Sequence, residues 1–354
     1  MSKSKIIALT ALISLVFGMT VIDNAFGAKK VLIKLQNAFP KALPIGVTWW
    51  AEQLKEVSQG DIAIKIYEPG ELVGPFEILD AVSSGKVDAG YVGDGFFADK
   101  IPAVQVFSTI PFGPEADEYM AWYYHGNGAK LHQWAYDQAG FNVKVIPVVM
   151  VVPETSGWFK KPVESVGDLK GMKMRFYGLG GQVMQKLGMS VTVMPAGELF
   201  AALEKGVIDA TEFSMPTLDH MLGFYKIAKY NYFPGWHQQA TIMPVYINKD
   251  KWNAMSKTQQ KMIELACMAS ITNSIAQGEA TQGAVIKENV QERGVRNMYW
   301  SKEMLQAFKK AWEEVAAEQC AKDLVFKKCF EDLQAFRAEY KYWQNLGFLP
   351  RNCK

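Results

Sequence analysis

The sequence has few of the residues on which metalloenzymes and nucleophilic enzymes depend. It holds only four histidines and four cysteines in 354 residues. It contains no HExxH pair, no Gly-x-Ser-x-Gly elbow, no P-loop and no paired CxxC spacing for zinc. Residues 178–181 are rich in glycine, but Val183 stands where a dinucleotide-binding fingerprint needs its third glycine. The sequence therefore offers no visible carrier of enzymatic chemistry.

A strong charge of one sign is also missing. The formal net charge is +2, from 38 basic and 36 acidic residues that are interspersed along the chain. Nucleic acid would require a basic tract or patch, so it is not an expected partner. Beyond the N-terminal residues, no segment is apolar enough to span a bilayer.

The N-terminal 27 residues are typical of an export signal. Lys3 and Lys5 precede an uncharged apolar stretch over 6–21, and small residues follow at Ala25 and Gly27. This order predicts cleavage after Gly27 and a periplasmic protein. The alternative, an N-terminal anchor that is retained, needs a longer apolar run.

All four cysteines lie in the last quarter of the chain, at positions 267, 320, 329 and 353. Export permits disulfides among them. The sequence leaves their pairing open, and free buried thiols are an equal alternative.

An internal repeat predicts two lobes. Residues 77–89 (Glu-Ile-Leu-Asp-Ala-Val-Ser-Ser-Gly-Lys-Val-Asp-Ala) align without a gap with residues 198–210 (Glu-Leu-Phe-Ala-Ala-Leu-Glu-Lys-Gly-Val-Ile-Asp-Ala). Each copy predicts a short helix closed by a glycine, Gly85 or Gly206, and then a strand. Earlier strands are expected at 31–35 and 62–67 in the first half, and at 172–176 and 189–194 in the second. Each half therefore has the order β-α-β-α-β, which builds a parallel sheet.

These patterns predict an α/β protein with a ligand cleft between two lobes and long C-terminal helices. We expect a signal peptide over 1–27, a first lobe over 28–152, a second lobe over 153–248 and a helical region over 249–354 that crosses both lobes. Further elements are expected as a helix over 119–139, a strand-like run over 141–152 broken by Pro147, a strand over 240–247 that runs back across the lobes, and helices over 252–283 and 302–346. The apolar faces of the last helices could seal a dimer.

Arg175 is the most informative single residue. It ends a predicted buried strand, at the edge of the sheet where ligands of α/β proteins bind. A buried guanidinium needs a carboxylate, which either an internal acid or a ligand can supply, and the sequence leaves both open. Glu212 and Phe213 end the matching strand of the repeat. Glu154, Glu212 and Gln238 offer hard oxygen ligands that suit sodium or calcium better than a transition metal.

Several aromatic side chains are candidates for the wall of a pocket, although each is equally at home in a core. They are Trp236, Trp158, Tyr91, Tyr177 and Phe96.

Two stretches carry a resemblance to a known family. They are Gly-Asp-Leu-Lys-Gly-Met-Lys-Met-Arg over 167–175 and Met-Pro-Ala-Gly-Glu-Leu-Phe-Ala-Ala-Leu-Glu-Lys-Gly-Val-Ile-Asp-Ala over 194–210. With them the chain resembles, over about 30–348, the solute receptors of tripartite ATP-independent periplasmic (TRAP) transporters. The resemblance implies the two-lobed periplasmic binding protein fold and a membrane permease as partner.

Within that family the chain is most similar to the branch that binds 2-oxo and 2-hydroxy acids, judged by residues 157–159, 209–212 and 232–236. The resemblance implies that Arg175 forms a salt bridge with the substrate carboxylate. It also implies that Glu212 and the residues at 154 and 238 help to hold a metal ion that the substrate touches. Some members of this branch exchange C-terminal helices between protomers, which implies a homodimer, although packing within one chain explains these helices equally well.

Three positions depart from the pattern of that branch. Glu154 replaces the usual glutamine, Gln238 replaces an acid, and Phe213 replaces tryptophan. The exchange of Glu and Gln keeps the charge around a metal similar, whereas the loss of the indole N–H removes a hydrogen-bond donor and alters the acid that fits.

The expected function is that of a periplasmic receptor for a small 2-oxo or 2-hydroxy monocarboxylate, with Na⁺ or Ca²⁺ bridging to the ligand. The expected substrate-binding residues are Arg175, Glu154, Phe213, Gln238, Trp236, Tyr91 and Tyr177. Two alternatives stay open: an exported metal-dependent enzyme acting on an organic acid, and a ligand-sensing receptor that partners a chemoreceptor or kinase ectodomain.

Overall fold

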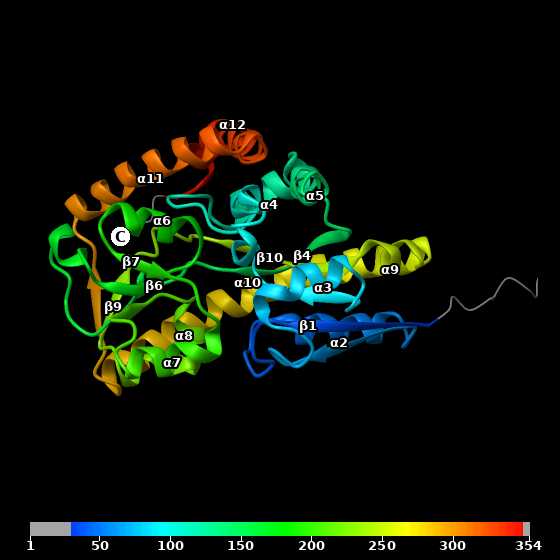
Figure 1. Cartoon of the computed structure of the whole chain (residues 1–354), viewed down its shortest axis with the longest axis horizontal. Coiled ribbons are helices and arrows are strands. Elements are labelled where there is room, and N and C mark those ends of the chain that lie inside the picture. The colour runs from blue at the N-terminus through cyan, green and yellow to red at the C-terminus, as the bar shows by residue number, and fades with distance from the viewer. Residues whose placement is uncertain (1–29, 350–354) are drawn as a thin grey trace, which may run out of the picture.

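The computed structural model describes residues 30–349, so the predicted signal peptide and Cys353 lie outside it. Two mixed sheets form the centres of two lobes, with helices packed around them (Figure 1). The first sheet has the order β2-β1-β3-β10-β4, and the second has the order β11-β9-β5-β8-β6-β7. The mixed α/β fold predicted from the sequence is confirmed.

The strands of the first sheet are β1 (Val31–Asn37), β2 (Ile62–Tyr67), β3 (Ala89–Tyr91), β4 (Val143–Val151) and β10 (Thr241–Asn248). Those of the second are β5 (Gly157–Phe159), β6 (Lys173–Arg175), β7 (Ser190–Thr192), β8 (Ala210–Thr211), β9 (Tyr230–Phe233) and β11 (Arg296–Tyr299). The helices are α2 (Val47–Val57), α3 (Ile78–Ser83), α4 (Ala116–His125), α5 (Gly128–Gln138), α6 (Gly178–Lys186), α7 (Ala196–Glu204), α8 (Pro216–Leu222), α9 (Lys249–Asn253), α10 (Lys257–Gln291), α11 (Lys302–Lys322) and α12 (Leu324–Gly347). Short 3₁₀ helices that matter below are η2 (Asp94–Phe97) and η3 (Pro102–Phe107).

The sequence repeat corresponds to a structural repeat. In the first sheet β2, β1 and β3 are parallel neighbours, and in the second β7, β6 and β8 are parallel neighbours in the same relative order. Gly85 and Gly206 follow the helices of the two copies with φ of +76° and +74°, the left-handed conformation that glycine adopts without strain. The predicted β-α-β-α-β order of each half is therefore confirmed.

Antiparallel strands complete both sheets and connect the lobes. β10 lies antiparallel between β3 and β4, and β5 lies antiparallel between β8 and β9. The chain leaves the first sheet after β4 and returns to it at β10, so β10 pairs in the first lobe although it falls in the range expected for the second. We call residues 152–156 and 234–240 the crossover segments. The lobe boundaries themselves stay a prediction.

Three element predictions need correction. The helix expected over 119–139 is two helices, because the chain turns at Gly126, where an added Cβ would lie 2.6 Å from the Trp122 carbonyl oxygen. Pro147 does not break its strand: it pairs with Pro244 beside an irregularity in register, where neither strand needs an N–H donor. The regions expected to be helical over 252–283 and 302–346 each contain two helices. In each region the second helix begins at a capping residue, Ser256 or Asp323.

Long C-terminal helices tie the lobes together. α10 packs against β4 and α2 in the first lobe and against α8 in the second. α11 packs on α6, and α12 continues over η3, α4 and α5 (Figure 1). Between residues 30 and 349, no helix combines the length and apolar character that crossing a membrane demands. Cys267, Cys320 and Cys329 are free thiols.

Candidate functional site

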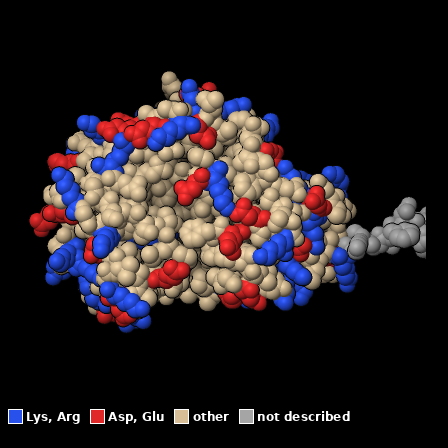
Figure 2. Space-filling view, in the orientation of Figure 1, with Lys and Arg blue, Asp and Glu red and all other residues tan. Residues whose placement is uncertain are grey.

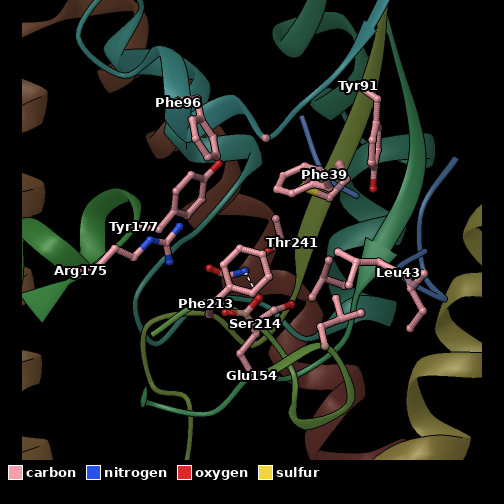
Figure 3. A pocket seen from close by; sticks show the side chains of 16 residues that line it. Phe39, Leu43, Tyr91, Phe96, Glu154, Arg175, Tyr177, Phe213, Ser214 and Thr241 are labelled. Carbon is pink, nitrogen blue, oxygen red and sulfur yellow. Dashed lines mark hydrogen bonds between the residues drawn. The ribbon is translucent and has the colours of Figure 1, made fainter. Parts of the chain in front are cut away.

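A pocket lies between the two lobes at the carboxyl ends of their parallel strands. Its volume is about 540 Å³, counting the space at its open mouth. In Figure 3, Arg175 and Tyr177 enter from one side, and Phe39 and Leu43 line the opposite side. The lining residues are Phe39, Leu43, Ile45, Tyr91, Gly93, Phe96, Val151, Glu154, Arg175, Tyr177, Phe213, Ser214, Leu218, Gln238, Thr241 and Met243. Acidic and basic side chains are interspersed over the surrounding face of the molecule (Figure 2).

Arg175 is the cationic group of this pocket. It ends β6, and only 2 % of the residue is exposed. Its Nη1 donates to Glu212 Oε2 and to the Glu212 carbonyl oxygen, both at 2.6 Å, while its Nε has no hydrogen-bond partner among the described residues. The guanidinium also lies over the rings of Phe213 and Tyr177, with its Cζ 5.4 and 5.9 Å from their centroids. The sequence left open whether Arg175 pairs with an internal acid or is available to a ligand. The structure shows both, because Arg175 pairs with Glu212 and also faces the pocket.

Glu212 fixes the position of Arg175 through hydrogen bonds. Its carboxylate is fully buried, and its Oε1 accepts a hydrogen bond of 2.8 Å from the backbone N–H of Tyr177. Burial raises the pKa of Glu212, and the adjacent Arg175 opposes that rise. The Glu212 carboxylate therefore holds both Arg175, at the end of β6, and the backbone of Tyr177.

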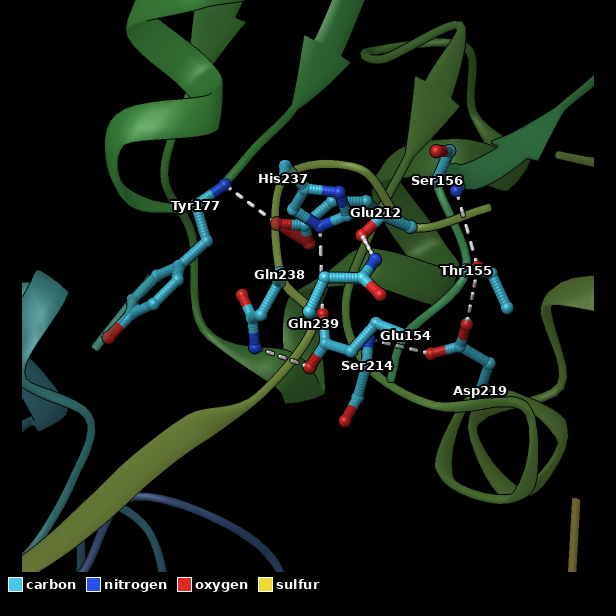
Figure 4. Close-up of polar contacts among 12 residues, drawn as sticks. Glu154, Thr155, Ser156, Tyr177, Glu212, Ser214, Asp219, His237, Gln238 and Gln239 are labelled. Atoms are coloured by element: carbon cyan, nitrogen blue, oxygen red, sulfur yellow. Dashed lines mark hydrogen bonds and ion pairs between the residues drawn. The ribbon is translucent and has the colours of Figure 1, made fainter. Parts of the chain in front are cut away.

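A second acidic group, Glu154, lies on the first crossover segment and meets the other crossover at Gln238. Gln238 Nε2 donates to Glu154 Oε1 at 2.6 Å, and His237 Nε2 lies 3.6 Å from Glu154 Oε2 (Figure 4). Burial and the nearby acids Glu212 and Asp219 raise the pKa of Glu154 well above its usual range. Burial, followed by the charge of Arg175, lowers the pKa of His237 to about 3, so its imidazole is neutral.

The two crossover segments approach closely because of Gly235. A Cβ on this residue would lie 2.2 Å from the Glu154 carbonyl oxygen. The Glu154 N–H in turn donates to the carbonyl oxygen of Gln238 at 3.3 Å. Any residue larger than glycine at position 235 would separate the two side chains that share this part of the pocket.

Asp219 stabilises the first crossover segment next to Glu154. This carboxylate in α8 is fully buried and accepts hydrogen bonds from the Ser214 N–H at 3.0 Å and Thr155 Oγ1 at 3.3 Å (Figure 4). It also accepts a hydrogen bond of 2.8 Å from Trp158 Nε1. It therefore joins the first crossover segment, β5 and the residues that follow β8.

The pocket floor fits a hard cation. Glu154 Oε2, Gln238 Oε1 and both ring nitrogens of His237 are buried without a hydrogen-bond partner among residues 30–349. Ligand atoms of Glu154, Glu212 and His237 all lie within 4.8 Å of one another. Carboxylate and amide oxygens are ligands that sodium and calcium prefer. Unsatisfied buried oxygens are costly, and a cation would remove that cost.

Much of the wall of the pocket is apolar. Leu43, Ile45, Val151, Leu218 and Met243 line it, and Phe39 and Phe213 pack edge to face nearby with ring centroids 6.4 Å apart. The site thus combines one cation, a cluster of unpaired oxygens and an apolar wall. This combination suits a small monocarboxylate with an apolar tail.

The predicted site residues divide into two groups. Those that line the pocket are Arg175, Glu154, Phe213, Gln238, Tyr91, Tyr177 and Phe96, and Glu212 lies behind Arg175. Trp236 and Trp158 are buried outside the pocket: Trp236 packs on Phe176 and Phe308, and Trp158 bonds to Asp219.

Sequence reasoning missed His237 and the aliphatic wall. His237 directly precedes Gln238, a predicted cation ligand, and this position in the sequence was the available signal that it lies near the site. The wall residues come from loops, strands and helix α8 of the two lobes, and no local pattern marks them.

Known proteins resemble this chain over most of its length. Residues 41–323 match the family model described as bacterial extracellular solute-binding protein, family 7. The chain is 35 % identical, over 91 % of its length and 88 % of the relative's, to a monocarboxylate 2-oxoacid-binding periplasmic protein of Nostoc sp..

Two solved structures share the fold closely. A TRAP periplasmic solute-binding protein of Pseudoalteromonas atlantica, with bound sodium and pyruvate, has a TM-score of 0.86 at 30 % identity, covering 90 % of this chain and 97 % of that one. A TRAP transporter solute-binding protein of Bordetella bronchiseptica has a TM-score of 0.85 at 28 % identity, covering 90 % and 95 %. The Bordetella protein is described as a mixed-occupancy dimer with copurified calcium and picolinate in its active site.

Proposed function

The chain belongs to family 7 of the bacterial extracellular solute-binding proteins, the solute receptors of TRAP transporters, and we propose that its solute is a 2-oxo monocarboxylate with an apolar side chain. Because the family consists of solute-binding proteins, the alternative of an exported enzyme is set aside. Binding and release are the whole of its chemistry.

One observation carries the proposal: Arg175 faces a pocket that has unpaired buried oxygens at its floor and aliphatic side chains along much of its wall. The guanidinium offers its remaining N–H groups to a carboxylate, and bonds between such charged groups are strong. A 2-oxo group beside that carboxylate is a second oxygen ligand for a cation. The apolar wall accepts the side chain and disfavours a second carboxylate, which would lie there without a partner.

A bound cation is the second part of the proposal. Glu154, Glu212 and Gln238 would hold sodium or calcium, with His237 beside them as a neutral nitrogen donor. The cation supplies positive charge between the acidic side chains and the solute's oxygens. Support comes from the Pseudoalteromonas protein, which binds sodium with pyruvate, and from the Bordetella protein, which binds calcium with picolinate.

Isothermal titration calorimetry tests solute and cation together. We expect pyruvate and 4-methyl-2-oxopentanoate to bind to protein supplied with calcium, and succinate and L-leucine not to bind. After removal of cations with EDTA we expect weaker binding, which added calcium or sodium restores. Binding of an amino acid or a sugar in place of the 2-oxo acids would contradict the proposal.

We further propose that the receptor is exported through a signal peptide cleaved after Gly27 and delivers its solute to a TRAP membrane permease. The family membership supports this location and partner. N-terminal sequencing of protein secreted to the periplasm tests the cleavage position.

We also propose a homodimer through the C-terminal helices. The last turns of α12 and Leu349, two residues beyond the helix, expose large apolar side chains: Tyr342, Trp343, Leu346 and Leu349 are 78, 60, 85 and 88 % exposed. A surface of this kind favours association, and a second copy supplies the matching patch in a two-fold contact. The dimeric Bordetella protein supports the association of two copies.

A further inference from the structure

Tyr177 joins the two lobes beside the pocket. It follows β6 in the second lobe, and its hydroxyl accepts a hydrogen bond of 2.7 Å from the backbone N–H of Gly95 in the first lobe. The same hydroxyl shares a hydrogen bond of 3.0 Å with Ser108 Oγ, just after η3. Both bonds are buried, and burial raises the pKa of Tyr177, so the hydroxyl stays protonated. A single side chain thus makes two polar bonds across the lobes.

The Tyr177 ring packs against the backbone of Gly93 and Gly95, a surface that we call the glycine seat. A Cβ on Gly93 would lie 2.5 Å from Tyr177 Oη, and a Cβ on Gly95 would lie 2.5 Å from Tyr177 Cζ. Neither distance is possible for a real side chain, so the ring can occupy this place only because both positions lack a Cβ. The next residue makes a similar close approach, because a Cβ on Gly178 would lie 2.3 Å from Thr109 Oγ1. The surfaces of the two lobes are therefore complementary at this point.

The glycine seat is held rigidly from the first lobe. Asp94, between the two glycines, is fully buried, and its Oδ1 accepts hydrogen bonds from the hydroxyls of Tyr136 and Tyr246. Its Oδ2 lies 3.2 Å from His132 Nε2, a distance that allows an ion pair. These contacts come from α5 and β10, so the short η2 turn is fixed to the centre of the lobe.

The other side of the contact is fixed to the binding site. Glu212 accepts from the Tyr177 N–H through Oε1 and from Arg175 through Oε2. The residue that we propose to bind the solute and the residue that bridges the lobes are therefore held by one carboxylate. A change in the position of either is transmitted to the other through a short, buried path.

We propose that Tyr177 is a positioning residue that latches the lobes together: its hydroxyl and ring dock in the Gly93–Gly95 seat and stabilise the closed arrangement around the pocket. The latch acts with or without a solute, since all its contacts are between protein groups. It sets the balance between open and closed protein, and through that balance the release rate of any solute the pocket holds.

Tyr177→Phe tests the latch, because it removes the two bonds and keeps the ring. Tyr232→Phe is the matched control: its hydroxyl accepts from the Val163 N–H at 2.6 Å, within the second lobe only. By small-angle X-ray scattering of ligand-free protein, we expect a larger radius of gyration for Tyr177→Phe than for the wild type or Tyr232→Phe. In stopped-flow experiments with calcium and pyruvate, we expect release of pyruvate to become roughly tenfold faster, as the loss of two hydrogen bonds implies.

Two further variants separate the latch from direct contact with the solute. Ser108→Ala removes one of the bonds, and Ser108 does not line the pocket, so a smaller effect of the same sign is expected. Gly95→Ala blocks the seat and should give the most open protein of the series, with a melting temperature close to that of the wild type. If Tyr177→Phe matches Tyr232→Phe in both measurements, the latch is refuted. If the wild type fails to bind pyruvate, the proposed solute is wrong, and the scattering series alone then decides on the latch.

Discussion

Replacing Arg175 with methionine separates the two roles that the structure gives to this residue. The substitution keeps the length of the side chain and removes its charge and donors. Arg175 is 2 % exposed and Glu212 is fully buried, so the variant leaves a carboxylate without the cation that lay 2.6 Å away. Breaking a buried pair on one side costs about 3–5 kcal/mol, so we expect a loss of this order in the free energy of unfolding at pH 8.

The loss should shrink as the pH falls. Without Arg175, burial of Glu212 is opposed by the hydrogen bond from the Tyr177 N–H but no longer by a positive charge, so its pKa in the folded state rises further above that of the unfolded chain. The folded state then binds more protons than the unfolded state between those two values, so its relative stability increases as the pH is lowered. Urea unfolding of the metal-free proteins at pH 8 and pH 5 measures this difference.

The double variant Arg175→Met, Glu212→Gln provides the decisive comparison. It removes the uncompensated charge, so most of the lost stability should return, while binding of pyruvate should stay at least about 100-fold weaker than in the wild type. Arg337→Met is the control, because Arg337 pairs with Glu118 at 3.1 Å away from the pocket and should leave binding unchanged. A double variant that binds pyruvate within threefold of the wild type would refute the role of Arg175 in recognition.

Three further predictions concern other parts of the molecule. Asp219→Ala leaves the indole N–H of Trp158 without its buried acceptor. We therefore expect a loss of about 1–3 kcal/mol in the free energy of unfolding, measured in urea, together with weaker pyruvate binding. A variant with both values unchanged would contradict the supporting role of Asp219. His237 has a pKa of about 3 in the folded state against about 6.5 in the unfolded chain, so the folded state binds fewer protons as the pH falls. From this group, the metal-free wild type should lose roughly 2 kcal/mol of its free energy of unfolding between pH 7.5 and pH 5, and His237→Gln should not show this loss. Equal pH dependence of the two proteins would show that this imidazole is not buried in its neutral form. Leu346→Glu should convert a dimer to a monomer by multi-angle light scattering without changing the melting temperature of the protomer, and a dimer that persists would place the contact elsewhere.

The order of the elements was predictable because it depends on local signals. The repeat over 77–89 and 198–210 ends each helix with a glycine and begins each strand with an acidic residue, and such signals do not depend on distant contacts. The position of β10 between β3 and β4 was not predictable in this way. It depends on which strands pair across ninety residues or more, and an apolar run fits any neighbour equally well.

The candidate site was predictable where it follows from strand ends. Arg175 and Glu212 each come at the end of a parallel strand, and in the structure they meet. Glu154 and Gln238 lie on segments without regular structure, so their oxygen ligands alone suggested them and the family resemblance was needed to give them a role. His237 and Trp236 show the limit: these neighbours lie on one irregular segment, and composition cannot say that the His237 side chain lies beside Glu154 whereas Trp236 packs in the core.

The crossover segments place two kinds of group in one pocket. Glu154 and Gln238 lie on the segments that connect the lobes, where their side chains are hydrogen-bonded to each other. Tyr177 instead extends from the second lobe to Gly95 in the first. In a protein that closes about a hinge, the connecting residues move less than the lobes. The residues that hold the solute's oxygens and the residue that encloses the solute are therefore different, and each can be altered without the other.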